Sequence, residues 1–164
     1  KMVREILLLG NPQLYEVSEP VTEDDAAQLP AWIGDLRDTL HDFRNRVGQA
    51  RAIAAPQIGL KKRIIYMDLE REYVFINPVL QFPSPEKYRL KDDCMSFPGL
   101  LVEVERYLHC AITYLDERLE RQQLVVSGAM AELIQHEYDH LDGILATMRA
   151  LDNRSFYIRR GKQR

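Results

Sequence analysis

The sequence predicts an α+β fold rather than a wound α/β sheet. Runs rich in β-branched and aromatic residues fill the middle of the chain, at 63–69, 73–80, 100–104, 108–115 and 123–126. A helical pattern precedes them, and a second covers about 127–140. Because the strands follow one another instead of alternating with helices, we expect helices and strands to be segregated along the chain.

The bulk composition is typical of one ordinary globular domain. The 164 residues suit a single domain spanning 1–164, with 46% hydrophobic and 29% charged residues. The net charge of −3 provides no field that would attract the whole molecule to nucleic acid. No run of about 18 apolar residues is present, so we expect no membrane span. Two cysteines in a chain of this size predict reduced thiols and a cytoplasmic location.

The first predicted helix extends to about residue 46. Apolar residues recur along it at spacings of three and four, namely Leu29, Ile33, Leu36, Leu40 and Phe43. Thr22 is a suitable N-cap, but Pro30 lies inside the pattern. The regular helix is therefore expected to begin near Pro30.

The remaining segments are predicted to be turns and loops. A short extended run at 6–9 ends in Gly10-Asn11-Pro12, and 70–72 forms a hairpin turn between two strands. Segment 81–93 contains two prolines and several charges, which predicts a loop. The basic tail, 152–164, is expected to be exposed.

The last helix contains an H-E-x-x-H pattern at His136, Glu137 and His140. Residues four apart on a helix lie about 5–6 Å apart at Cβ, so both imidazoles can bind one cation. Glu137 lies where it can take a proton from a water at that ion. The alternative is a surface helix with two histidines by chance. Apolar neighbours on the helix favour burial, and buried histidines need partners.

A catalytic metal site needs three protein ligands and one open position. The remaining candidates are His41, His109, Cys94 and Cys110. Cys110 lies in an apolar strand, so it is expected to fill the core, and His109 beside it to be a strand histidine without a ligand role. Cys94 lies in the polar stretch 92–99, which favours a role in the site, while the residues alone leave His41 open.

Three segments in a fixed order resemble the peptide deformylase family closely. They are ARAIAAPQ at 50–57, DDCMS at 92–96 and QHEYDHLDG at 135–143. Asn77-Pro78 and Arg106 are also similar to the family pattern, so the resemblance covers about residues 5–156. It implies antiparallel sheets packed around the histidine helix. It also implies hydrolysis of the N-formyl group from the first methionine of newly made polypeptides.

The resemblance implies a role for each matched position. Cys94, His136 and His140 would hold one divalent metal ion, usually Fe(II) in the family and zinc in some members. Glu137 would be the general acid/base. The Gln57 amide and the backbone N–H of Met95 would stabilise the charge that develops on the formyl oxygen. The substrate would be an N-formylated nascent peptide, and we expect a monomer.

The sequence departs from the family beside the expected substrate cleft. Ala50 and Ala52 replace glycines, Arg51 replaces an aliphatic residue, and Asp92-Asp93 replaces Glu-Gly. We therefore expect an altered side-chain pocket, lined by Arg51, Ala52, Ile53, Asp93 and Leu133. Arg51 and Asp93 carry opposite charges and are expected to pair at its rim. Arg106 is expected to pair with Asp92, because a partly buried charge needs a partner.

Two other functions are compatible with the sequence. One is a related enzyme that hydrolyses another N-acyl or formyl amide. The other is a non-catalytic metal-binding protein that contacts the ribosome surface through the basic tail. The presence of Glu137 and Gln57 argues against the second, since binding alone requires neither residue.

Overall fold

The computed structural model describes residues 2–160, which contain two α-helices and eight strands. The helices are α1 (Leu29–Val47) and α2 (Gly128–Leu141). The strands are β1 (Ala52–Ala54), β2 (Ile64–Asp68), β3 (Glu72–Gln81), β4 (Lys87–Asp92), β5 (Leu100–Tyr107), β6 (His109–Leu115), β7 (Arg121–Ser127) and β8 (Phe156–Ile158). Four 3₁₀-helices complete the described elements: η1 (Pro12–Tyr15), η2 (Glu23–Asp25), η3 (Ala55–Ile58) and η4 (Ala146–Arg149).

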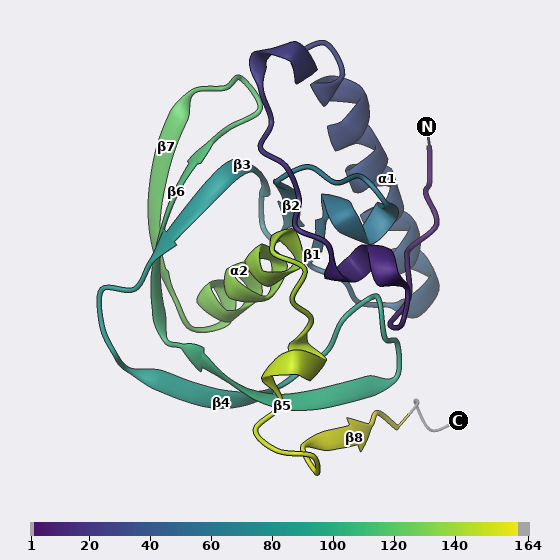
Figure 1. The fold of residues 1–164 in the computed structure, drawn as a ribbon, viewed down its shortest axis with the longest axis vertical. Helices are drawn as coiled ribbons and strands as arrows, with labels where there is room; N and C mark the ends of the chain where they lie inside the picture. Colours follow the sequence, from purple (N-terminus) through teal and green to yellow (C-terminus); the bar gives the residue numbers. More distant parts are fainter. Residues whose placement is uncertain (1, 161–164) are drawn as a thin grey trace.

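The strands form two antiparallel sheets around α2 (Figure 1). The larger sheet has the order β1-β2-β3-β6-β7, and the smaller has the order β4-β5-β8. Every strand pair in both sheets is antiparallel. The predicted α+β class and the central histidine helix are therefore confirmed.

Helix α1 confirms the predicted start and end of the first helix. Pro30 lies in its first turn, where the missing N–H costs nothing, and η2 precedes it. Gly48 ends the helix with a φ of 97°, a left-handed conformation that glycine adopts without strain. The apolar face of α1, including Leu36 and Leu40, packs into one core cluster with Ile53 of β1.

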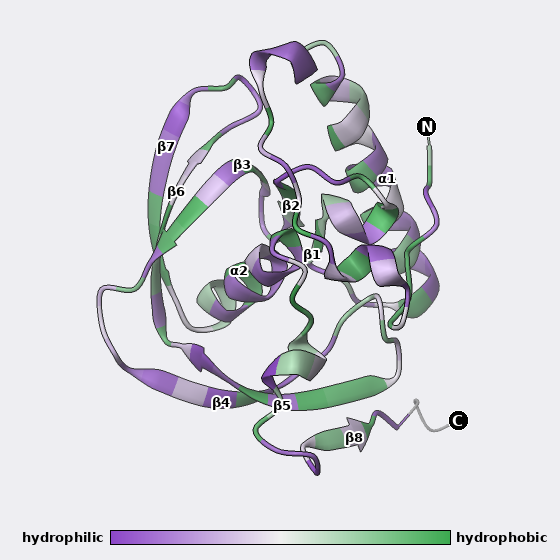
Figure 2. Cartoon of the chain, viewed as in Figure 1, coloured by the Kyte–Doolittle hydropathy of each residue, from purple (hydrophilic) through white to green (hydrophobic). Residues whose placement is uncertain are grey.

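Helix α2 is buried along most of its length. Ser127 is the N-cap, and apolar residues such as Ile134 and Leu141 pack against the larger sheet. Gly143, just beyond the helix, has a φ of 73°, and a Cβ there would lie 2.4 Å from the Tyr15 carbonyl oxygen. Only glycine fits this close approach. In Figure 2, hydrophobic and hydrophilic residues are mixed along both α1 and α2.

The structure corrects the prediction that 81–93 is a loop. Residues Lys87–Asp92 form β4, which pairs with β5 along its whole length. The charged side chains of Lys87, Arg89 and Lys91 alternate outward, while Leu90 and Asp92 face inward. The charges therefore mark the solvent face of a strand, and only the part containing Pro83 and Pro85 is irregular.

Two short strands were also missed. β1 and β8 have three residues each and gain their hydrogen bonds from β2 and β5. β8 lies within the predicted basic tail; its side chains are exposed, as expected, but its backbone is held in the smaller sheet. Residues 161–164 of that tail lie outside the described residues. Neither described helix combines the length and the apolar character needed to cross a bilayer.

Candidate active site

Three possible metal ligands converge on one point between the two sheets. His136 and His140 lie on one face of α2, and Cys94 lies in the turn that follows β4. One ligand atom from each residue lies within 4.8 Å of the others, and Cys94 Sγ is 3.3 Å from His140 Nε2. Within the described chain, the predicted trio is therefore brought together, while His41 and His109 lie elsewhere.

The donor set and its surroundings fit a transition-metal cation. One thiolate and two imidazoles suit Zn(II) or Fe(II) and disfavour Mg²⁺ or Ca²⁺. Burial lowers the pKa of His140 well below 6.5, whereas the pKa of His136 is raised well above 6.5, because Asp92 and Cys94 outweigh the effect of burial there. His136 Nδ1 lies 2.9 Å from Asp92 Oδ2, so its other ring nitrogen is directed toward the site.

A buried network of charged side chains contacts His136 through Asp92. Arg106 donates to Asp92 at 3.0 Å and to Asp139 at 2.7 Å, and Arg149 also donates to Asp139. Burial opposes the ionisation of Asp92, but the nearby His136 and Arg106 outweigh this effect and lower the pKa of Asp92 to about 2. The expected Arg106–Asp92 pair is confirmed, and the structure extends it to Asp139 on α2.

Replacing Arg106 with alanine is expected to destabilise the protein strongly. Arg106 is only 3% exposed, and its loss leaves the Asp92 and Asp139 carboxylates without their central cation. Removing one partner of a buried ion pair typically costs about 3–5 kcal/mol. Urea unfolding of the metal-loaded protein measures this change in the free energy of unfolding.

Arg89→Ala is the matched control for this variant. Arg89 is an exposed arginine on the neighbouring strand β4, with a long 4.0 Å contact to Glu105. Its replacement is expected to change the free energy of unfolding by less than about 1 kcal/mol. Equal stability of the two variants would show that the network around Arg106 contributes nothing.

Glu137 faces the ligand cluster from the same helix. Its side chain is buried, and within residues 2–160 its Oε1 atom has no hydrogen-bond partner. Burial raises the pKa of Glu137 to about 7. A carboxyl group with a pKa near neutrality can both accept and donate a proton at physiological pH.

Gln57 is fixed on the other side of Cys94. Its Oε1 accepts the Ala54 N–H at 2.9 Å, and its Nε2 donates to Ser96 Oγ at 3.1 Å and lies 3.5 Å from Cys94 Sγ. The N-terminal segment holds this region, because Leu7 N–H donates to the Gln57 carbonyl at 2.8 Å. Among the described residues, the N–H of Met95 donates to no other group. The side-chain amide of Gln57 and the backbone N–H of Met95, the residue after Cys94, thus lie beside the cluster.

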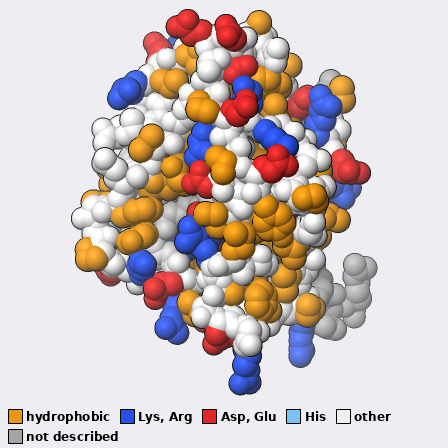
Figure 3. Space-filling model, in the orientation of Figure 1, with side chains coloured by type: hydrophobic (Ala, Val, Ile, Leu, Met, Phe, Trp, Pro, Cys, Tyr) orange, Lys and Arg blue, Asp and Glu red, His pale blue; other side chains and the backbone are white. Residues whose placement is uncertain are grey.

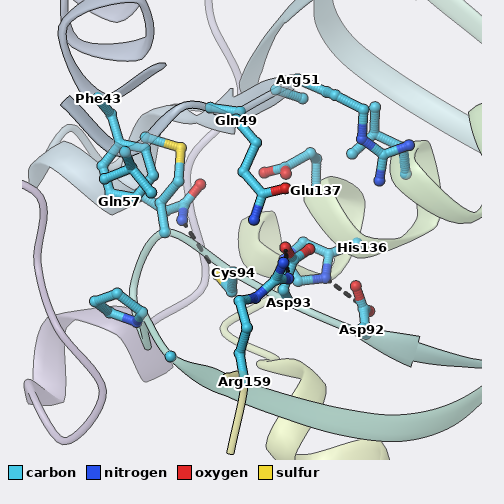
Figure 4. A pocket seen from close by; sticks show the side chains of 17 residues that line it. Phe43, Gln49, Arg51, Gln57, Asp92, Asp93, Cys94, His136, Glu137 and Arg159 are labelled. Atoms are coloured by element: carbon cyan, nitrogen blue, oxygen red, sulfur yellow. Dashed lines mark hydrogen bonds and ion pairs between the residues drawn. The ribbon is translucent and has the colours of Figure 1, made fainter. Parts of the chain in front are cut away.

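These groups line a cavity of about 330 Å³ (Figure 4). Of the five predicted pocket residues, Arg51, Ala52, Asp93 and Leu133 line it. Ile53 does not: its side chain is fully buried in the core against α1. Because side chains in β1 alternate between faces, Ala52 and Ile53 point in opposite directions, and the prediction for Ile53 was wrong.

The expected ion pair between Arg51 and Asp93 was also wrong. Arg51 Nη2 donates to Glu132 Oε1 at 2.9 Å, whereas Asp93 accepts from Arg159 Nη2 at 2.6 Å. Glu132 is a buried carboxylate on α2 and takes the nearby cation. Arg159 reaches Asp93 because β8 pairs with β5 and the backbone N–H of Arg159 donates to the Gly99 carbonyl at 2.8 Å.

Sequence reasoning missed several residues of the cavity. Phe43, Gln49 and Arg159 line it, and Figure 4 shows the Gln49 side chain reaching toward its centre. Glu132 had a detectable signal, because it places a charge one helical turn before His136 on a helix whose apolar residues predict burial. Arg159 had none, since its position depends on a pairing between distant strands.

Comparison with known proteins agrees with this geometry. The sequence model described as polypeptide deformylase matches residues 3–155. A peptide deformylase of Treponema pallidum (strain Nichols) is 40% identical over 143 residues, covering 86% of this chain and 84% of that protein. A peptide deformylase of Pseudothermotoga lettingae is 36% identical over 159 residues, covering 97% of this chain and 90% of that protein.

A solved structure shows the same arrangement of elements. The crystal structure of peptide deformylase from Thermotoga maritima superposes with a TM-score of 0.85 at 30% sequence identity. The superposition covers 93% of this chain and 100% of that one. On the sequence match and the shared fold together, the chain belongs to the peptide deformylase family.

Proposed function

We propose that this protein is a metal-dependent hydrolase that removes the N-formyl group from the first methionine of newly made polypeptides. The observation that carries the proposal is the convergence of Cys94, His136 and His140 beside Glu137 in one cavity. A site for metal binding alone needs neither a buried acid/base nor oriented N–H donors. This site has both.

The chemistry follows from where these groups point. A divalent cation held by the thiolate and the two imidazoles supplies a Lewis acid that makes water nucleophilic near neutral pH. The Gln57 Nε2 and Met95 N–H groups donate to the formyl oxygen as charge develops on it. Such a donor is typically worth about 3 kcal/mol in the transition state. Glu137 accepts the proton of the attacking water and donates it to the leaving amine.

The finer properties are also proposals. We propose Fe(II) as the resident ion, with zinc as the second choice, because both suit the S/N/N donor set. We propose that residues 1–164 form a single catalytic domain that works as a cytoplasmic monomer. A contact with the ribosome would use the basic tail. Figure 3 shows Lys and Arg side chains scattered over one face of the molecule. Within the tail, Arg159 is paired with Asp93.

The test is metal-dependent turnover under oxygen-free conditions. Iron-loaded protein is expected to release formate from formyl-Met-Ala-Ser, to lose this activity when the metal is chelated, and to recover it when Fe(II) is returned. The acetylated peptide tests for an enzyme that removes other acyl groups. Faster hydrolysis of acetyl-Met-Ala-Ser, or no hydrolysis of either peptide by fully loaded protein, would contradict the proposed reaction.

A further inference from the structure

Arg51, which lines the cavity, forms an ion pair with Glu132, which lies behind it and does not line the cavity. Arg51 precedes β1, and Glu132 lies in the first half of α2. The Glu132 side chain is 7% exposed, whereas that of Arg51 is 43% exposed and lines the cavity. The buried carboxylate therefore holds a half-exposed guanidinium that borders the cavity.

The pair lies where the first side chain of a substrate would bind. Gln57 and Arg51 are at opposite ends of the cavity in Figure 4, with Glu137 and His136 between them. A formyl oxygen directed to Gln57 places the amide nitrogen, and the residue attached to it, on the Arg51 side. Leu133, one helical turn before Glu137, also lines the cavity.

The pair leaves hydrogen-bonding capacity unused. A guanidinium carries five N–H donors, and within the described chain Arg51 donates only to Glu132. The second carboxylate oxygen, Glu132 Oε2, is buried and has no described partner. An apolar side chain pressed against Arg51 would remove water from these donors without replacing its hydrogen bonds, which is unfavourable.

We propose that the Arg51–Glu132 pair adds a second substrate class to the proposed deformylase activity. This class consists of N-formyl peptides whose first side chain carries a strong oxygen acceptor. Glutamine and methionine sulfoxide have such an oxygen at about the length of methionine. The methionine thioether is only a weak acceptor. The inference rests on the proposed function, because it needs the formyl group to bind between Gln57 and the ligand cluster.

The experiment compares matched substrates on wild type and on an apolar pair. The variant is Arg51→Leu/Glu132→Leu, because exchanging both members of an ion pair that has a buried partner for apolar residues leaves no unpaired buried charge. The substrates are formyl-X-Ala-Ser peptides with glutamine, methionine sulfoxide, methionine or norleucine as X. We expect the kcat/KM ratio of glutamine to norleucine to fall by about tenfold to a hundredfold in the variant, as for the loss of a hydrogen bond to a charged group.

Two further variants make the result specific. Arg37→Leu/Glu72→Leu removes a similar ion pair, with an N–O distance of 3.2 Å, that does not line this cavity, and should leave the ratio unchanged. Arg51→Gln/Glu132→Gln removes both charges but keeps hydrogen-bonding groups, and should give an intermediate ratio. If the Arg51→Leu/Glu132→Leu variant does not fold, the Arg51→Gln/Glu132→Gln variant is compared with wild type in its place.

The outcomes separate this inference from the proposed function. Suppose that wild type hydrolyses formyl-methionyl peptides and that all variants have the same glutamine-to-norleucine ratio of kcat/KM as wild type. The subsite assignment is then wrong, and the deformylase function stands. If metal-loaded wild type hydrolyses none of the peptides, the proposed function fails and the subsite assignment fails with it.

Discussion

Cys94→Ser or His140→Ala is expected to release the metal ion from the purified protein. Each change removes one of three donors whose ligand atoms lie within 4.8 Å of one another. A serine hydroxyl is a far poorer ligand for Zn(II) or Fe(II) than a thiolate. Because the site needs all three ligands, formyl-peptide hydrolysis should fall to background in both variants. The measurement is the ratio of metal to protein by elemental analysis after dialysis against a weak chelator.

The chain supplies a matched control for each ligand. Cys110 is a fully buried cysteine in the core, and burial raises the pKa of its thiol to about 11, so it is a poor metal ligand. His109 lies 2.7 Å from the Ser127 hydroxyl and is not one of the three clustered ligands. Cys110→Ala and His109→Ala should therefore retain one ion per chain. Stoichiometric metal in the Cys94 and His140 variants would show that the ligand assignment is wrong.

Glu137→Gln is expected to separate metal binding from catalysis. Glutamine has nearly the same shape as glutamate but cannot transfer a proton, and Glu137 is not one of the three clustered ligands. The variant should keep its metal and fold. Its kcat should fall by about 10²- to 10⁴-fold, the usual contribution of a general acid/base. Steady-state hydrolysis of formyl-Met-Ala-Ser, at equal metal content, measures the loss.

Glu103→Gln is a suitable comparison for the Glu137 variant. Glu103 is a glutamate on β5 that accepts from the Tyr157 hydroxyl at 3.2 Å and does not line the cavity. Its replacement should leave kcat unchanged. A Glu137→Gln variant as fast as this control would rule out proton transfer by Glu137.

Much of the site was predictable because it is encoded locally. Helical geometry places residues four apart on one face, so the sequence alone predicts that His136 and His140 lie side by side. Cys94 and Gln57 lie in short segments whose residue order alone carries the resemblance. The pairing of Arg106 with Asp92 was also predictable, since two charges in matched segments need partners when buried.

The errors share one physical origin. The identity of β4 depended on β5 lying beside it, since its alternating charges could equally belong to a loop. Ile53 was assigned to the cavity because its neighbours are there, but the strand directs it into the core. The partners of Arg51 and Asp93 come from 81 and 66 residues away along the chain. No local pattern specifies contacts at such separations.

The α+β class and both helices could be predicted from the sequence because helical periodicity and strand composition act over a few residues, and the three short segments that resemble the family identified the Cys94, His136 and His140 cluster with Glu137 beside it. Which charges border the cavity depended on the folded arrangement of distant elements. Glu132 reaches Arg51 because α2 packs beside β1, and Arg159 reaches Asp93 because β8 pairs with β5. The attraction between opposite charges depends on their distance in space and not on a local sequence pattern. Which charges pair therefore depends on which elements the folded core brings close together.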